Sequence, residues 1–334
     1  MSLTPVYFAT NRTKNDAMPF GFGNNSAPYN PQTITFARAD VDNVNLANED
    51  SGVIRSISDV TTANFSSKAT AEIVGAKKNL MIFIHGFDNS FSDAIKRAAF
   101  NREWFAESGV AAADTTVIAF SWPSAGKLLD TIPNPPPEAY LADQVQAGLS
   151  AFPIAYFLQV VDQLQRTYRE ANPTGRVFLL AHSMGNHALS GAIQLWMNSN
   201  DPRDLIFDEV ILAAGDEVAT TLEMPSVGQM SGLRSLAKRT SIYHSQRDVA
   251  MYLSTAINLN PRLGFDGPPN KRNEAIYPPQ LFRIIDCTQV CDYALLVPPD
   301  ATHQYYRRSH IVRSDISMIF GGAAATGGIG SLSS

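Results

Sequence analysis

A serine within a run of small residues is the strongest candidate for chemistry in this chain. Ser183 lies in Ala181-His182-Ser183-Met184-Gly185, between a β-like apolar run and a helix-like segment. A sharp turn from strand to helix lifts a serine hydroxyl above the end of a sheet. It requires small residues two positions before and after the serine. Gly185 meets this requirement, and Ala181 is a small substitute for the usual glycine. We predict a nucleophilic serine; the alternative is a tight turn without chemistry.

Such a nucleophile needs hydrogen-bond donors for the negative charge that develops on the substrate oxygen. His85-Gly86-Phe87 directly follows the apolar run 80–84. A turn after an early strand supplies one donor in enzymes with this serine turn, and the residue after the nucleophile supplies the other. We therefore expect the main-chain amides of Phe87 and Met184 to form the oxyanion hole. The ring of His85 is expected to be buried and structural.

The general base must be one of six histidines, which are His85, His182, His187, His244, His303 and His310. The first four fall within predicted strands, helices or turns. With this serine turn the chain order is nucleophile, acid, then a histidine on a loop after the last strand. His303 follows a Pro-rich loop, whereas the pattern of 304–319 places His310 on a helix. His303 is the favoured base, and an imidazole suits proton transfer near neutral pH.

Two aspartates beyond Ser183 compete for the role of the acid that orients the imidazole. Asp248 follows the β-like run 241–244, and Asp216 follows the run 210–214. The commoner position is after the penultimate strand, which favours Asp248, while Asp216 remains the alternative acid. Either aspartate has a structural alternative as the N-cap of a following helix.

The elements that must position these residues alternate along most of the chain. Continuous apolar runs at 80–84, 117–120, 177–181 and 210–214 are typical of strands buried on both faces. Helical patterns follow them, including a long stretch over 139–170 that Pro153 is expected to kink or split. This alternation predicts an α/β fold with a mostly parallel central sheet flanked by helices.

We expect a single domain over residues 1–320, with the remaining segments as an extension and insertions of it. Residues 1–75 are polar with short β-like pieces, which indicates an N-terminal β extension. The Pro-rich stretches 132–137 and 255–300 indicate loop or cap insertions near the site. Aromatic residues in or near these stretches either line an acyl pocket or pack in the interior; they are Trp122, Tyr140, Phe265 and Tyr277. The Gly-, Ala- and Ser-rich tail 321–334 is predicted to be flexible.

Composition narrows the classes of partner. Hydrophobic residues make up 45% and charged residues 17%, which is enough apolar material for a large core. A net charge of -5 gives no indication of nucleic acid as a partner. No apolar run reaches the length of a membrane span. The start of the sequence lacks the features of a signal peptide, so we expect a cytoplasmic protein, or a secreted one if such a peptide was removed.

Two cysteines, Cys287 and Cys291, are too few for a disulfide scaffold or a structural zinc site. We interpret them as ordinary thiols, with a local disulfide as the alternative in an exported protein. We expect no metal or cofactor.

Taken together, the chain resembles a bacterial branch of the α/β-hydrolase superfamily whose function is unknown. The matching segments are Val6–Arg12, Phe83–Phe87, Phe120–Ser124, Ala181–Asn186, Tyr243–Asp248 and His303–Tyr306. The resemblance implies an α/β-hydrolase fold and the triad Ser183, Asp248 and His303, and it supports Asp248 over Asp216. It also implies esterase or lipase-like activity without a defined substrate.

The function that follows is hydrolysis of carboxylic esters through an acyl-enzyme intermediate, on a small-molecule or lipid-like substrate. An acyltransferase or amidase on the same triad is the alternative among enzymes. A binding protein that is catalytically silent on this fold is the alternative from another class. The sequence does not specify acyl length, alcohol or oligomeric state.

Overall fold

The computed structural model describes residues 3–60, 65–76, 78–106, 115–124, 137–198, 205–223, 229–293, 302–322 and 327–334. The strands are β1 (Thr4–Thr10), β2 (Arg12–Lys14), β3 (Phe22–Ser26), β4 (Thr35–Asp42), β5 (Val53–Asp59), β6 (Asn79–Ile84), β7 (Thr115–Ser121), β8 (Val177–His182), β9 (Glu209–Ala213), β10 (Thr240–His244), β11 (Phe282–Gln289) and β12 (Gly328–Ser333). The helices are α1 (Ser67–Gly75), α2 (Phe91–Ala106), α3 (Pro137–Leu149), α4 (Ala151–Ala171), α5 (Gly185–Met197), α6 (Leu233–Leu236), α7 (Val249–Asn258), α8 (Leu263–Asp266), α9 (Tyr305–Arg308) and α10 (His310–Phe320). Two short 3-10 helices span Pro19–Gly21 and Pro31–Thr33.

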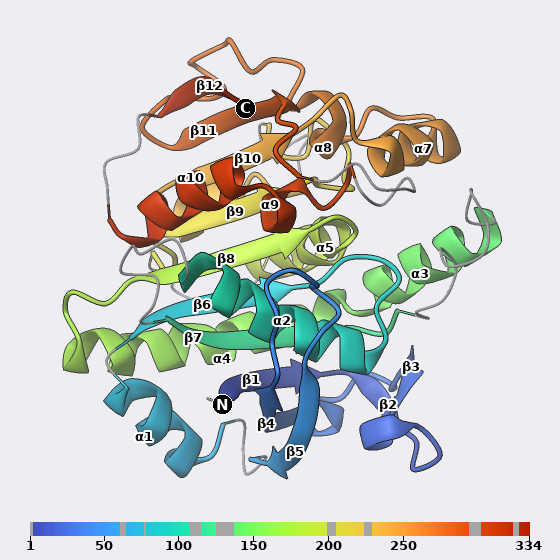
Figure 1. Cartoon of the computed structure of the whole chain (residues 1–334), viewed down its shortest axis with the longest axis vertical. Coiled ribbons are helices and arrows are strands. Elements are labelled where there is room, and N and C mark those ends of the chain that lie inside the picture. The colour runs from blue at the N-terminus through green and yellow to red at the C-terminus, as the bar shows by residue number, and fades with distance from the viewer. Residues whose placement is uncertain are drawn as a thin grey trace.

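Ten of these strands form one sheet in the order β12-β11-β10-β9-β8-β6-β7-β1-β4-β5. The pairs from β12 to β1 are parallel, and β4 and β5 add antiparallel strands at one edge (Figure 1). The predicted mostly parallel sheet with an N-terminal β extension is confirmed. The extension is part of the sheet itself, because β1 pairs directly with β7.

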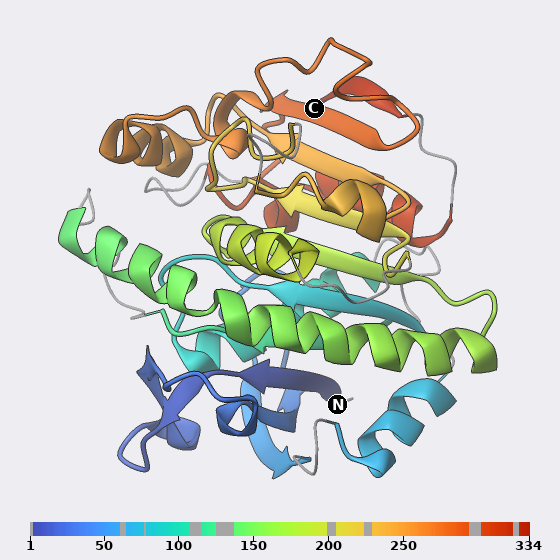
Figure 2. The same cartoon turned by 180° about the vertical axis from the view of Figure 1, so that it is seen from behind.

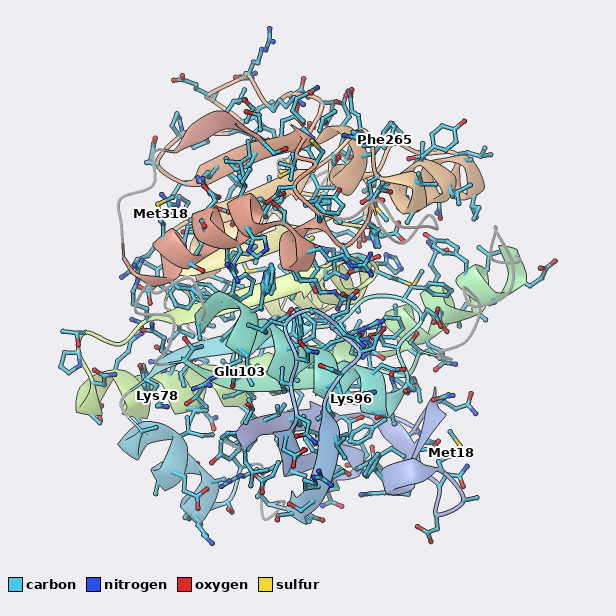
Figure 3. The ribbon with its side chains drawn as sticks, viewed as in Figure 1. Met18, Lys78, Lys96, Glu103, Phe265 and Met318 are labelled. Carbon is cyan, nitrogen blue, oxygen red and sulfur yellow. The ribbon has the colours of Figure 1, made fainter. Side chains whose placement is uncertain are left out.

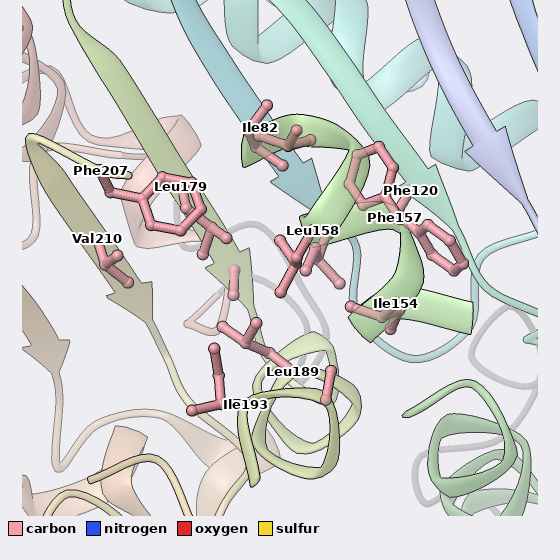
Figure 4. Packing of buried hydrophobic residues seen from close by; sticks show 14 of the residues in the cluster. Ile82, Phe120, Ile154, Phe157, Leu158, Leu179, Leu189, Ile193, Phe207 and Val210 are labelled. Carbon is pink, nitrogen blue, oxygen red and sulfur yellow. The ribbon is translucent and has the colours of Figure 1, made fainter. Parts of the chain in front are cut away.

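Helices cover both faces of this sheet. α2, α9 and α10 lie on the face seen in Figure 1, whereas α4 and α5 cross the opposite face seen in Figure 2. Figure 4 shows α4 and α5 packing on β6, β7 and β8, with Leu158 and Leu189 pointing toward Leu179. The central strands β6 and β8 are almost entirely apolar, as is typical of strands whose two faces are both buried in this way.

The register aligns the carboxyl ends of the strands that precede the candidate residues. Ile84 of β6 lies opposite Ala181 of β8, and His182 lies opposite Ala213 of β9. Ala213 in turn lies opposite Tyr243 of β10. The turns after these four strands therefore meet at one edge of the sheet, where α/β proteins bind their ligands.

Two segments were predicted from sequence as one long helix and as a flexible tail, and the structure describes the helical segment and most of the tail. The helical stretch 139–170 is split into α3 and α4 at Ser150, three positions before Pro153, because proline is tolerated in the first turn of a helix. The predicted flexible tail differs from the structure, since residues 328–333 form β12 on the edge of β11. Backbone hydrogen bonds to an open strand edge account for this strand, and composition does not report them.

Side chains fill the space between the layers, and several of the longer ones reach the surface (Figure 3). Phe265 of α8 lies beside α7 in that view, and its ring is 6.1 Å from that of Tyr252. Tyr277 is buried against Phe282. Both cysteines are free thiols, Cys287 buried and Cys291 exposed. The Pro-rich segment up to residue 136 and residues 294–301 lie outside the described residues.

Candidate active site

Ser183 stands in a strained turn between β8 and α5. Its φ is +53°, a left-handed conformation that a residue with a side chain rarely adopts without a structural reason. The backbone on both sides is crowded: a Cβ at Gly185 would lie 2.7 Å from the Ile84 carbonyl oxygen, and one at Gly86 would lie 2.8 Å from Ser183 Cβ. Glycine at 185 is thus required by close approach of the two turns, as the sequence pattern predicts.

Asp248 and His303 form a buried pair although 55 positions separate them. His303 Nδ1 lies 2.8 Å from Asp248 Oδ2, and the Asp248 side chain is fully buried. Burial raises the pKa of Asp248, while the charge and hydrogen bond of His303 and the amides of Ala250 and Met251 oppose that rise. Asp248 Oδ1 also accepts from the Met251 amide, so the same carboxylate caps α7.

The turn after β6 lies directly against the Ser183 turn. Gly86 contacts the Ser183 position, and Phe87 follows it at the edge of the cavity described below. Neither the Phe87 nor the Met184 N–H has a hydrogen-bond acceptor within the described part of the chain. His85 is buried with its Nδ1 2.9 Å from the Gly86 carbonyl oxygen, which agrees with the structural role predicted for its ring. Burial lowers its pKa to about 3, so the ring is neutral.

A cavity of about 170 Å³ opens beside these turns, and Ser183 and His303 both line it. One wall is mostly apolar and comes from α7, through Ala250, Met251, Leu253 and Ile257. Other lining residues are polar and include Asp50, Asp88, Asn89, Arg97 and Gln304. Of the four aromatic residues considered from sequence, only Tyr140 lines this cavity among the described residues; Trp122 stacks on His85 instead.

Asp216, the alternative acid, also lines the cavity but binds no histidine ring in the described structure. Its carboxylate accepts hydrogen bonds from Tyr140 Oη at 2.8 Å and from Ser254 Oγ. Arg262 Nε lies 3.5 Å away. Asp216 therefore links α3 to α7 across the cavity.

The remaining histidines have other partners. His182 packs between the rings of His303 and Tyr306, and burial lowers its pKa far below the ordinary value. His187 Nδ1 lies 2.8 Å from Glu217 Oε2. His244 is buried in β10, where burial lowers its pKa to about 4, and His310 begins α10 beside Trp104. Of the six histidines, His303 is the one that combines a buried carboxylate partner with a place in the cavity beside Ser183.

Two supporting residues were not singled out from sequence. Asn89 and Arg97 both line the cavity, and they hydrogen-bond to the turn that carries Phe87 and to each other. Neither has a sequence signature, since their contacts come from different elements. Arg12, in the segment Thr10-Asn11-Arg12, is buried beneath the same turns.

Among the described residues, no group of three or more His, Cys, Asp or Glu side chains is placed to hold a metal ion. No described helix is long and apolar enough to cross a membrane.

Comparison with known proteins provides a family match. The model of the family described as "Alpha/beta hydrolase of unknown function (DUF900)" matches residues 62–313. No curated protein matches the chain.

Among solved structures, the lin2722 product of Listeria innocua is 10% identical with a TM-score of 0.38, covering 76% of this chain and 98% of that one. A CIB-like hydrolase from Thermoplasma acidophilum is 10% identical with a TM-score of 0.30, covering 86% and 91%. Phospholipase PlaB from Legionella pneumophila is 12% identical with a TM-score of 0.26, covering 69% and 41%. None of these likenesses is close enough to assign an activity.

Proposed function

The chain belongs to this family of alpha/beta hydrolases of unknown function, and we propose that it is a serine hydrolase that cleaves carboxylic esters through an acyl-enzyme intermediate. The observation that carries the proposal is the buried Asp248–His303 pair, whose imidazole shares a cavity with a serine in a strained strand-to-helix turn. A carboxylate bound to Nδ1 fixes the tautomer in which Nε2 takes up a proton.

In the proposed reaction Ser183 Oγ attacks the ester carbonyl while His303 Nε2 takes the hydroxyl proton. The Phe87 and Met184 amides hold the resulting oxyanion. The tetrahedral intermediate collapses as His303 returns the proton to the leaving alcohol. A water molecule, with His303 again as the base, then releases the carboxylic acid and restores Ser183.

The cavity walls support a division of the substrate into two parts. The apolar wall from α7 suits an acyl chain, because apolar surface is favourably removed from water there. The polar lining residues Asp50, Asp88 and Arg97 suit a polar alcohol. A cavity of about 170 Å³ favours short acyl chains over long ones.

The first test is covalent labelling of the folded protein with a fluorophosphonate probe. We expect Ser183 to be labelled, and Ser183→Ala to abolish labelling. The matched control is Ser190→Ala, which removes another buried serine, one that lies within α5 and hydrogen-bonds to Glu217; it should label as wild type does. Failure of wild-type Ser183 to react would favour the silent binding protein over an enzyme.

The second test is a panel of p-nitrophenyl esters of increasing chain length, followed by product analysis. Loss of Ser183 should lower kcat by on the order of 10⁴-fold or more. Activity in Ser183→Ala equal to wild type would remove this serine from the mechanism. Faster turnover of amides than esters, or acyl transfer to an added alcohol in preference to water, would favour the amidase or acyltransferase alternative.

A further inference from the structure

The turn that carries Phe87 is held through its carbonyl groups. Trp122 Nε1 donates to the His85 carbonyl at 2.7 Å. Asn89 Nδ2 donates to the next two carbonyls, those of Gly86 at 3.0 Å and Phe87 at 2.6 Å. In a planar trans peptide the C=O and the following N–H point in opposite directions. Binding of the Gly86 carbonyl by Asn89 therefore turns the Phe87 N–H away from Asn89.

Asn89 is itself fixed at three points. Arg97 Nη1 donates to its Oδ1, which orients the amide so that Nδ2 faces the two carbonyls. Its backbone N–H donates to Ser124 Oγ at 3.1 Å, and Ser124 in turn donates to the buried Asp143. Its backbone carbonyl accepts from Arg12 Nη2 at 2.8 Å. A side chain constrained in this way has one orientation, so the turn it binds also has one.

Arg12 joins this turn to the segment that follows β7. The same Nη2 donates to the Trp122 carbonyl at 2.6 Å, and Nη1 donates to the Ser124 carbonyl at 3.3 Å. Nε donates to Ser121 Oγ at 3.0 Å. The side chain is almost completely buried, and burial lowers its pKa to about 9, which still leaves it charged at neutral pH. A buried guanidinium with this many acceptors is costly to move, because any displacement leaves charge unpaired.

Arg12 lies in the N-terminal extension, at the start of β2 and two positions after the end of β1, before the residues 62–313 that match the family. β1 is paired with β7, so Arg12 enters beneath the site at the level of Ser121, which lies opposite Thr10 in the register. The extension thus contributes to the site although it contains none of the predicted triad residues.

We propose that Asn89 and Arg12 are positioning residues for the turn that carries the Phe87 amide of the oxyanion hole. Asn89 sets the direction of this amide. Arg12 holds Asn89 and the Ser121–Ser124 segment beneath it in place. The inference rests on the proposed function, because it assigns these residues to the oxyanion hole of that reaction. They touch no reacting atom, and they act through the placement of a donor that must already be in position when charge develops.

The test compares the full-length variants Asn89→Ala and Arg12→Met with wild type. Both should lower kcat for a p-nitrophenyl ester about 10- to 100-fold and change KM less than about 3-fold, because the oxyanion exists only beyond the ground state. The inhibition constant of a trifluoromethyl ketone, whose serine adduct carries the same oxyanion, should rise by the factor by which kcat falls. A role in stability alone would not couple these two quantities.

The matched control is Arg283→Met, which removes another buried guanidinium, one paired with Asp315 of α10. It should lower Tm while leaving kcat within about 3-fold of wild type at 25 °C. Asn89→Asp keeps the shape of the side chain but removes the N–H donors of Nδ2. Arg12→Lys keeps a positive charge but removes the planar set of guanidinium N–H donors. These two replace Asn89→Ala or Arg12→Met if either fails to fold, and the same direction of change is expected.

Folded Asn89 and Arg12 variants with kcat within about 2-fold of wild type would overturn the proposal, as would losses matched by Arg283→Met. Labelling by a fluorophosphonate separates this failure from failure of the proposed function. If wild-type Ser183 does not react, the serine hydrolase itself is contradicted. If wild type reacts and the variants react equally fast, only the positioning role is wrong.

Discussion

Strands β9 and β10 are neighbours, and a buried aspartate follows each of them, yet the two carboxylates have different partners. Asp216, after β9, lines the cavity and binds the hydroxyl groups of Tyr140 and Ser254. Asp248, after β10, lies behind His303 and binds its Nδ1. Exposure to the cavity therefore does not identify the partner of the imidazole.

The difference originates in the residues around His303. Thr302 Oγ1 accepts from the Val249 amide at 3.2 Å, which ties the residue before His303 to the first turn of α7 beside Asp248. At Asp216 the neighbouring space is filled by α3, which contributes Tyr140. Two carboxylates that each follow a strand of the same sheet thus acquire different roles from the elements that pack over them.

The largest expected effect separates the two aspartates by activity. Asp248→Asn should lower kcat by about 10³- to 10⁴-fold, because an amide no longer fixes the tautomer of His303 or stabilises its charged form. Asp216→Asn should lower kcat by less than about 10-fold, since it removes no partner of the imidazole. Steady-state kinetics on one p-nitrophenyl ester measures both. A larger loss in Asp216→Asn would reverse the assignment of the acid.

The next effect concerns stability. Asp216→Asn should lower the free energy of unfolding by about 1–3 kcal/mol, because it weakens hydrogen bonds to Tyr140 and Ser254 and leaves the nearby Arg262 without a carboxylate. Urea unfolding measures the change. Tyr140→Phe is the companion variant, and it should show a smaller loss because it removes one hydroxyl. An unchanged midpoint in both variants would show that the α3–α7 link contributes nothing.

The smallest expected effect is on stability and depends on pH. It concerns the pair of His187 and Glu217, on whose histidine the charge of Asp216 also acts. Burial alone would lower the pKa of His187, but the hydrogen bond and charge of Glu217 outweigh burial and raise it. Burial acts against ionisation of Glu217, yet His187 lowers its pKa. The contribution of His187 to the free energy of unfolding is therefore complete below its ordinary pKa of 6.5. It is lost as the pH rises through the raised pKa of the folded protein. The contribution of Glu217 to the free energy of unfolding is present above its ordinary pKa of 4.5. It is lost as the pH falls through the lowered pKa of the folded protein.

His187→Gln should therefore be less stable than wild type by about 1 kcal/mol near pH 5.5, and the difference should shrink as the pH rises through the raised pKa of His187. Thermal unfolding across this range provides the measurement. A difference that grows with pH would contradict the raised pKa. Because His187 does not contact Asp248 or His303, the proposed function predicts that kcat at pH 8 stays close to wild type.

Much of the fold was predictable because buried parallel strands have a recognisable composition. The runs at 80–84 and 177–181 became β6 and β8, and the small residue at 185 follows from the backbone contact with Ile84 and His85. The tail was not predictable in the same way. β12 exists because β11 offers an unpaired edge, and its Gly- and Ser-rich composition is typical of flexible segments.

The sequence by itself determined the nucleophile candidate, because a strand, a turn of small residues and a helix follow one another within about fifteen positions. It also offered an acid and a histidine in the chain order that usually accompanies this turn. Only the tertiary structure decided which aspartate meets His303, and that Asn89 and Arg12 hold the Phe87 turn. Those contacts join residues as far apart as Arg12 and Trp122, or Asp248 and His303, in the chain. Their distances depend on strand order and helix packing, which no local pattern of residues encodes.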